Sequence, residues 1–211
     1  TVGNVLAGDI VLPAQITRDN EDLDVTAIGA NAFQNTAITS VTIPASVKTI
    51  GDEAFQNTAI TEVTIPASVK TIGASAFFDT TSLESLVFAT GSACETIGIS
   101  AFQATAITAV TIPASVLTIR TKAFFNITSL STVVFVGAAD GSSACTSIGA
   151  NAFAYSAITA IAIPASVTSV GQAAFYGTTS LATVIISSAM TSYGASAFAT
   201  GSTTTNLVVT V

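Results

Sequence analysis

The sequence predicts a β-rich repeat solenoid, with a parallel β-sheet along one side and short turns, 3-10 turns or helical pieces along the other. β-branched residues alternate with polar ones in each repeat, which is typical of a short strand with one buried face. All five prolines occupy one position of the repeat, at Pro13, Pro44, Pro66, Pro113 and Pro164. The dipeptide Ala-Phe recurs at nearly regular intervals, ending at Phe33, Phe55, Phe77, Phe102, Phe124, Phe153, Phe175 and Phe198.

The repeat 38–58 shows how one coil is expected to form. Ile38, Val41 and Ile43 place aliphatic side chains on one face of a strand. Pro44 follows and ends the strand, because proline has no N–H to donate to a sheet. The same register predicts nine strands, which neighbour one another about 4.8 Å apart in a stack roughly 40 Å long. Their centres are Ile10, Val41, Val63, Leu86, Val110, Val133, Ile161, Val184 and Val209.

The second half of the same repeat returns the chain to the core. Val47 and Ile50 predict a second extended stretch, and Gly51 permits a sharp turn. The segment 52–55 is long enough for one helical turn that brings Phe55 into the core. A single coil cannot bury its apolar face, so stacked coils must share the core, with the phenylalanines as its continuous spine.

The repeats extend over the chain, so we expect residues 1–211 to form one solenoid of about eight repeats. Residues 1–36 form an N-terminal unit with an insertion at 15–24, residues 37–206 hold the regular repeats, and residues 207–211 form a terminal strand. No turn or polar cap follows that strand, and an uncovered strand edge invites pairing. End-to-end or edge self-association is therefore one expectation for this chain.

The segments 41–55, 63–77, 110–124 and 161–175 share the pattern V-T-I-P-A-S-V-x-T-I-G-x-x-A-F with few changes. They resemble the BspA-like (treponema-type) leucine-rich repeat over essentially the whole chain. The resemblance implies a curved leucine-rich-repeat solenoid, a secreted or cell-surface location, and adhesion to protein or cell-surface partners. It carries no catalytic motif.

Two departures from ordinary leucine-rich repeats concern the turns. Arg120 replaces the glycine of the Ile-Gly step, so that position does not require a positive φ. The asparagine ladder that follows the strand in ordinary leucine-rich repeats is missing. Serines that can hydrogen-bond the turn backbone stand there instead, at Ser46, Ser68, Ser115 and Ser166.

Composition excludes several classes of function. Half of the residues are hydrophobic, but no apolar run approaches the roughly 20 residues of a membrane-spanning helix. The net charge of −7 and the scattered basic residues argue against nucleic acid, whose phosphates require Lys and Arg. Histidine is absent, which removes the commonest general base and metal ligand. We therefore expect no catalytic residues, no metal and no cofactor, and hence no enzyme.

The two cysteines do not predict a disulfide. Cys94 and Cys145 take the place of the inward Val47 in coils two apart. Two coils separate Cα atoms by about 10 Å, whereas a disulfide allows roughly 7 Å at most. Buried free thiols are the expectation.

The insertion 15–24 is acidic, with Asp19, Glu21, Asp22 and Asp24. Their carboxylates could bind Ca²⁺, but the glycine and distal glutamate of an EF-hand loop are missing. A solvated loop is the better interpretation.

The outward face of the sheet is the candidate binding surface. It is nearly uncharged and partly apolar, which for an exposed face suggests contact with a partner. The alternative is a bland β-surface in which Thr and Val serve strand propensity. The candidate residues are Thr42, Glu62, Thr64, Val87, Thr111 and Val134.

A second column of hydroxyl residues is expected along the other extended stretch. It resembles the threonine arrays of ice-binding solenoids, although Lys48 and Lys70 interrupt the column beside it. The column consists of Thr49, Thr71, Thr96, Thr118, Ser147, Ser169 and Ser192.

Together these observations favour a non-enzymatic extracellular or cell-surface recognition and adhesion module that binds protein or glycan partners. The alternatives are a structural or self-assembling spacer and, third, an ice-binding solenoid. The chain begins at Thr1 rather than Met, so we expect a processed or excised form. Low charge and abundant Thr and Ser suit a secreted or surface protein.

Overall fold

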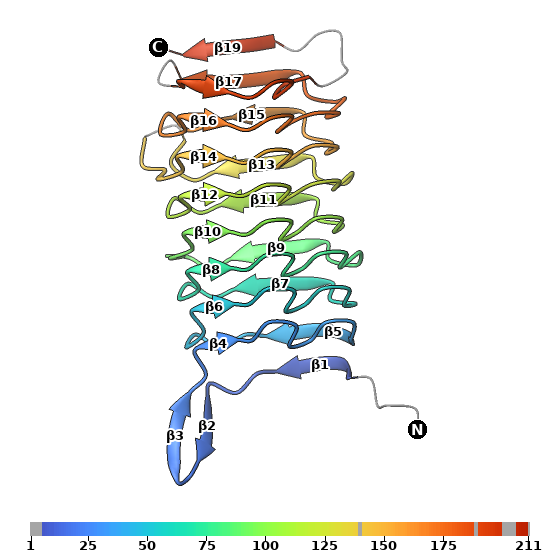
Figure 1. Ribbon diagram of the computed structural model, residues 1–211, viewed down its shortest axis with the longest axis vertical. Coiled ribbons are helices and arrows are strands. Elements are labelled where there is room, and N and C mark those ends of the chain that lie inside the picture. Colours follow the sequence, from blue (N-terminus) through green and yellow to red (C-terminus); the bar gives the residue numbers. More distant parts are fainter. Residues whose placement is uncertain (1–5, 139–140, 188–189, 200–205, 211) are drawn as a thin grey trace.

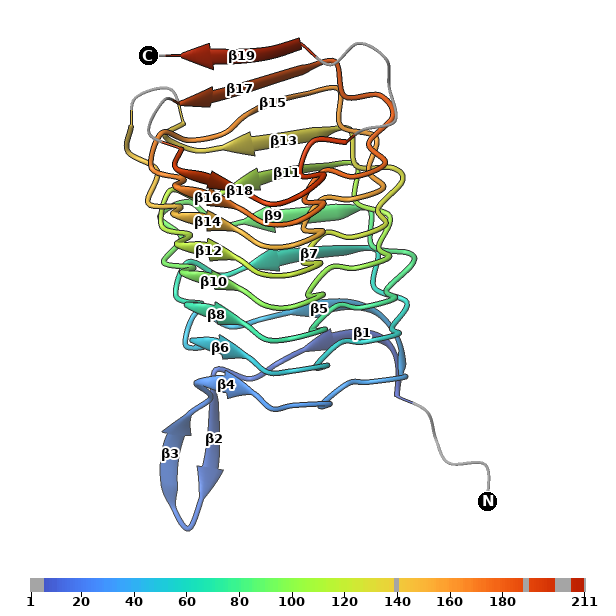
Figure 2. The same ribbon diagram turned by 45° about the horizontal axis from the view of Figure 1, so that its top comes forward.

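The structure, a computed structural model, describes residues 6–138, 141–187, 190–199 and 206–210. The chain winds into a stack of coils that lie one above another along the long axis (Figures 1 and 2). Each complete coil places one strand in a sheet of longer strands and one two-residue strand in a second sheet. The predicted β-rich solenoid is confirmed.

The sheet of longer strands is parallel throughout and contains all nine strand centres expected from the sequence. Its hydrogen-bonded ladder is divided into three segments, β1-β5-β7-β9, β11-β13 and β15-β17-β19. The two interruptions follow the two longest coils, which run from Phe77 to Phe102 and from Phe124 to Phe153. The strands are β1 (Ala7–Val11), β5 (Ala37–Thr42), β7 (Glu62–Ile65), β9 (Ser85–Phe88), β11 (Ala109–Ile112), β13 (Thr132–Phe135), β15 (Ala160–Ala162), β17 (Thr183–Ser187) and β19 (Asn206–Thr210). Val211, expected in the last strand, lies outside the described residues.

The second sheet is a continuous eight-stranded parallel ladder. Each strand is only two residues long, with one side chain pointing outward and one, in most strands, buried. It forms where the sequence predicts a second extended stretch. The strands are β4 (Ala27–Ile28), β6 (Thr49–Ile50), β8 (Thr71–Ile72), β10 (Thr96–Ile97), β12 (Thr118–Ile119), β14 (Ser147–Ile148), β16 (Ser169–Val170) and β18 (Ser192–Tyr193).

The third side of each coil consists of turns, and no helix occurs in the described part of the chain. Backbone N–H groups there alternate in direction. The N–H of Phe33 donates to Ala54 in the next coil at 2.8 Å, whereas that of Gln34 donates back to Asn31 at 3.2 Å. Asn31 and Asn35, at the two ends of this stretch, have positive φ values of 59° and 57°. The expected helical turn is therefore wrong, because a helix would direct every N–H along its own axis.

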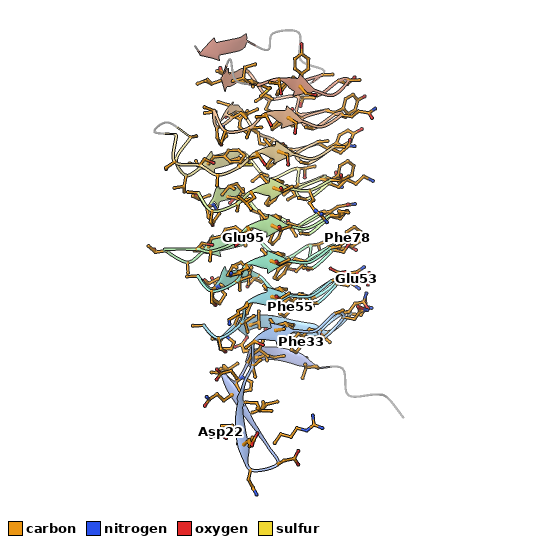
Figure 3. The ribbon with its side chains drawn as sticks, turned by 60° about the vertical axis from the view of Figure 1, so that its left-hand side comes forward. Asp22, Phe33, Glu53, Phe55, Phe78 and Glu95 are labelled. Atoms are coloured by element: carbon orange, nitrogen blue, oxygen red, sulfur yellow. The ribbon has the colours of Figure 1, made fainter. Side chains whose placement is uncertain are left out.

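The phenylalanine column forms the centre of the core, as predicted. Consecutive rings stack at centroid distances of 5.1 to 5.5 Å. Their planes lie within 15° of parallel. The six inner rings are fully buried, whereas Phe33 and Phe198 at the ends are partly buried and pack against the core. Figure 3 shows Phe33 and Phe55 inside the coils.

Buried hydroxyls close the turn that follows several of the core phenylalanines. Thr58 donates to the carbonyl of Phe55 at 3.0 Å, and Thr105 donates to that of Phe102 at 2.9 Å. Ser156 makes the same contact with Phe153 at 2.9 Å. These bonds give the carbonyl groups of the turn a side-chain donor inside the core.

Both cysteines are buried and free, as predicted. Burial raises the pKa of Cys94 to about 12 and that of Cys145 to about 11. Both side chains therefore act as small neutral core residues at physiological pH.

The insertion is a β-hairpin rather than the expected loop. β2 (Gln15–Arg18) pairs antiparallel with β3 (Glu21–Asp24) and extends away from the stack (Figure 1). Asp19 and Asn20 at its tip have φ values of 55° and 63°. Two consecutive positive φ values match the turn that connects twisted antiparallel strands, and Asp and Asn tolerate them.

The serine positions of the repeat behave largely as expected, although the bond runs to the preceding coil. Ser68 donates to the carbonyl of Val47 at 2.7 Å, and Ser115 donates to that of Cys94 at 2.8 Å. Ser46 does the same with Val25 at 2.8 Å. The hydroxyl of Ser166 is buried and has no hydrogen-bond partner.

The Ile-Gly step does not use a positive φ, which agrees with Arg120 at this position. Glycine is useful here for another reason, because the coils approach closely. A Cβ at Gly98 would lie 2.4 Å from the carbonyl oxygen of Gly73. The described part of the chain contains no helix that could span a membrane.

Candidate functional site

Outward side chains of the longer strands form a surface with regular rows. Ser40 of β5 aligns with Glu62 of β7, and Glu62 aligns with Ser85 of β9. Two residues further along, Thr64 aligns with Val87. The backbone register therefore holds these side chains at the strand spacing, about 4.8 Å apart.

A groove of about 660 Å³ lies on this sheet over β5, β7 and β9. Four of the six predicted binding residues line it: Thr42, Glu62, Thr64 and Val87. Val87 is 49% exposed, which is high for a valine in a strand. The groove continues onto the turn after the strands, through Ala45, Pro66, Ala67 and Ala89.

The remaining two predicted residues lie further along the stack. Thr111 of β11 aligns with Val134 of β13, and both side chains are exposed. Neither lines the groove, which covers β5, β7 and β9, and the hydrogen-bonded ladder is interrupted between β9 and β11. The structure therefore separates the six predicted residues into a group of four and a pair.

The groove is acidic at one edge. Asp9 of β1 aligns with Ser40, and its carboxylate accepts hydrogen bonds from Ser40 at 2.8 Å and Thr39 at 3.0 Å. These hydrogen bonds lower the pKa of Asp9, which stays ionised. Glu62 lies in the same row, next to Ser40 on its other side. Asp9 was missed in the sequence, although extending the row of Ser40 and Glu62 back by one strand locates it.

The hydroxyl column lies on the second sheet, in the predicted register from Thr49 to Ser192. The residue before each hydroxyl is exposed and includes Lys48, Lys70 and Glu95 in successive coils. Figure 3 shows Glu95 on the side opposite Phe78. Charged side chains thus flank the first half of the column.

The acidic residues of the hairpin are engaged with their neighbours across the strands. Asp22 accepts a hydrogen bond from Thr17 at 2.7 Å, and Asp24 accepts one from Gln15 at 2.9 Å. Within the described ranges, no group of three or more His, Cys, Asp or Glu side chains is placed to hold a metal ion. The hairpin is thus an exposed acidic structural element.

The stacked coils, two parallel sheets and repeated turns define a leucine-rich-repeat solenoid. The sequence matches the BspA type leucine rich repeat region in six copies, over residues 26–141 and 146–210. The chain belongs to this family. No match was found among curated protein sequences.

Solved structures of bacterial leucine-rich-repeat proteins share the fold. One from Bacteroides ovatus is 22% identical, with a TM-score of 0.65, and the match covers 88% of this chain and 59% of that one. A leucine rich cell surface protein from Faecalibacterium prausnitzii is 25% identical, with a TM-score of 0.58 and coverage of 98% and 60%. The T. pallidum leucine rich repeat protein is 22% identical, with a TM-score of 0.55 and coverage of 88% and 72%. This chain therefore spans about three fifths of the first two proteins.

Proposed function

We propose that this chain is a non-enzymatic recognition and adhesion module of a secreted or cell-surface protein. The observation that carries the proposal is the groove over β5, β7 and β9, which is open, positioned by the strand register and lined mainly by small hydroxyl and aliphatic side chains. The family and the cell-surface relative from F. prausnitzii support a surface location.

The chemistry of the groove favours a partner that presents an apolar segment beside a basic or hydrogen-bonding group. Val87, Ala67 and Pro66 offer apolar contact, while Glu62 supplies a carboxylate. Asp9 reinforces the negative charge at the same edge, beyond Ser40. A protein segment with Lys or Arg next to aliphatic residues meets both requirements.

The test substitutes residues that line the groove and leaves the core residues unchanged. Thr64→Arg and Val87→Glu place large charged side chains on the exposed face, and Thr168→Arg does the same at an exposed position beside β16. Beads coated with each variant are compared for retention on immobilised matrix proteins, glycans and cultured cells. We expect the groove variants to lose retention and Thr168→Arg to keep it.

Two results would contradict the proposal. If the unsubstituted chain is not retained on any of these surfaces, the adhesion role is wrong. If it is retained and both groove variants bind equally well, another surface must carry the binding.

The ice-binding alternative has one observation in its favour, the in-register hydroxyl column of the second sheet. The charged residues Lys48, Lys70 and Glu95 beside it weaken that alternative, because they disturb an ordered layer of water. A thermal-hysteresis measurement decides it directly.

A further inference from the structure

The residues that follow each core phenylalanine form an outer corner along the stack. In the first coils this corner carries amides. Gln34 donates to Gln56 at 2.8 Å and to Glu53 at 2.6 Å, and Asn57 donates to Asn35 at 2.8 Å. Figure 3 shows Glu53 and Phe78 at this corner, outside the column of Phe33 and Phe55. The amide side chains thus hydrogen-bond one another from coil to coil.

Later coils carry aromatic rings at the same corner. Phe125 meets Tyr155 edge to face at 5.5 Å and 89°, and Tyr155 meets Tyr176 in the same way at 5.6 Å and 84°. We call Phe125, Tyr155 and Tyr176 the aromatic corner. The two tyrosines are each 43% exposed, so their rings are available to a ligand.

Tyr155 occupies a backbone conformation that does not suit it. Its φ is 58°, a region in which a bulky side chain costs roughly 1 kcal/mol or more. Most other coils use Asn, Asp or Gly at this position: Asn35, Asn57, Asp79, Asn126 and Gly177. Among the described coils, Tyr155 is the bulkiest residue at this position, and Ala104 is the one other departure from Asn, Asp or Gly. A bulky residue in a strained conformation is a reason to look for a function.

Gly177 in the next coil makes room for the Tyr155 ring. A Cβ at Gly177 would lie 2.7 Å from Cδ1 of Tyr155, so the ring lies against bare backbone. Gly177 has a φ of 70°, which glycine adopts without strain. The two positions together hold Tyr155 in place beside Tyr176.

A hollow of about 340 Å³ opens beside Tyr155. Its rim includes the exposed hydroxyl residues Thr128, Thr179 and Ser180. All the lining residues are uncharged. The hollow is at the lower end of the range of small-molecule sites, which are typically apolar with a few placed polar groups.

We propose that the aromatic corner and its hollow bind a neutral saccharide. A sugar ring has a face of C–H groups and a rim of hydroxyls, so one face can lie against a tyrosine ring whose π surface is negative. Its hydroxyls meet those of Thr128, Thr179 and Ser180. Because the rings repeat from coil to coil, a saccharide chain can run along the stack.

The lack of charge separates this ligand from acidic ones. Phosphate and carboxylate ligands are held by Arg, Lys or helix N-termini, and none of these lines the hollow. Lys122 is nearby, but its ammonium lies 5.4 Å from the centre of the Phe125 ring. An uncharged polyhydroxyl ligand is therefore the class that fits.

The test uses substitutions that other coils of this chain already contain. Tyr155→Asn reproduces Asn35, Asn57 and Asn126, and Tyr176→Gln reproduces Gln34, Gln56 and Gln103. Both variants should fold, which circular dichroism and thermal unfolding check. The control is Tyr193→Val, which removes an exposed tyrosine of β18 and introduces the residue that stands at this position in β16.

The probes are cellohexaose, maltohexaose and mannohexaose, with hexagalacturonate as the acidic contrast. The chain has no Trp and three Tyr, so tyrosine fluorescence reports on the corner, and calorimetry gives the affinity. We expect at least one neutral hexasaccharide to bind, and each of Tyr155→Asn and Tyr176→Gln to weaken it at least about tenfold. Tyr193→Val should bind normally.

This proposal would be overturned by no binding of any neutral probe, by equal binding of the corner variants, or by tighter binding of hexagalacturonate. The site is separate from the groove on the longer-strand sheet. Thr64→Arg should therefore leave saccharide binding unchanged, and its loss there would assign the saccharide to the groove. The proposed adhesion role of the groove can fail without affecting the aromatic corner.

Discussion

Two neighbouring columns of this solenoid follow opposite rules. The core column is phenylalanine in all eight coils, from Phe33 to Phe198. The column one residue later varies, with glutamine at Gln34 in the first coil and aromatic rings at Phe125 and Tyr176 in later ones. The two positions are adjacent in the same turn, and they differ in that one side chain points into the core and the other points outward.

The difference shows which positions the stack constrains. An inward side chain must fill the same space between the same neighbours in every coil, because interiors are close-packed. An outward side chain meets solvent and its counterparts in adjacent coils, so several chemistries fit. The outer column can therefore vary without disturbing the core, and its residues can determine which ligand the solenoid binds.

The largest expected effect is on thiol reactivity, because the interior is closed to reagents. At pH 8, Cys94 and Cys145 should react with N-ethylmaleimide at least about 1000-fold more slowly than a free thiol, since labelling requires opening of the fold. Burial also keeps them protonated, with pKa values of about 12 and about 11. The rates are measured by quenching the labelling reaction at a series of times and analysing the protein by mass spectrometry.

The control is Glu95→Cys, which places a thiol on an exposed position beside Cys94. It should react at the rate of a free thiol, whereas equal rates at both positions would show that the core is not closed. Because the pKa of each buried thiol is raised in the folded chain, the unfolded chain loses these protons first. The thiols therefore reduce the free energy of unfolding only as the pH rises above the ordinary thiol pKa of 9.0.

The next largest effect is expected from removing one phenylalanine ring from the middle of the core column. Phe102→Ala removes a fully buried ring that stacks on Phe77 at 5.2 Å and Phe124 at 5.3 Å. The free energy of unfolding should fall by about 3–5 kcal/mol. Gln103→Ala, one residue later in the outer column, should change it by no more than about 0.5 kcal/mol. Urea denaturation compares the two, and similar losses would remove the distinction between the columns.

A smaller effect is expected from the buried hydroxyls that close the turns. Thr105→Val keeps the shape but removes the 2.9 Å hydrogen bond from the hydroxyl to the carbonyl of Phe102, which keeps only the longer bond of 3.4 Å from the N–H of residue 105. The lost bond should cost about 1–2 kcal/mol. Thr108→Val, at an exposed position, is the matched control. Equal midpoints in urea would show that the turn does not depend on this hydroxyl. Ile127 already occupies the corresponding position in one coil, so the fold survives one such loss.

The smallest effect is expected at the serine position that follows each proline. Ser115→Ala removes a hydrogen bond to the carbonyl of Cys94 and should cost about 1 kcal/mol. Ser166→Ala removes a buried hydroxyl that has no partner, so stability should be unchanged or slightly increased. Thermal unfolding of the two variants provides the comparison. A larger loss at Ser166 than at Ser115 would contradict the assignment of these contacts.

The repeat, the core columns and the buried cysteines could be predicted from the sequence alone. Each follows from a local pattern that recurs at a nearly constant period, so every copy supports the same register. Val41, Ile50 and Phe55 point inward for reasons that are visible within a single repeat. The candidate surface could also be located, because the residues between inward strand positions must point outward.

Only the tertiary structure decided how coils of unequal length stack. It divided the hydrogen-bonded ladder of the longer-strand sheet into three segments, and it placed Thr111 and Val134 outside the groove. It also showed that the insertion is a hairpin and that Asp9 completes the acidic edge. These features depend on contacts between coils, which a pattern within one repeat does not contain.

The aromatic corner illustrates the same limit. Phe125 and Tyr155 occupy different positions of the repeat, and more than one full coil of sequence separates them. They meet because the backbone at Tyr155 adopts a positive φ and Gly177 leaves space for its ring. The periodic pattern determined which side chains enter the core, whereas turn geometry and coil stacking decided which outer side chains form a site.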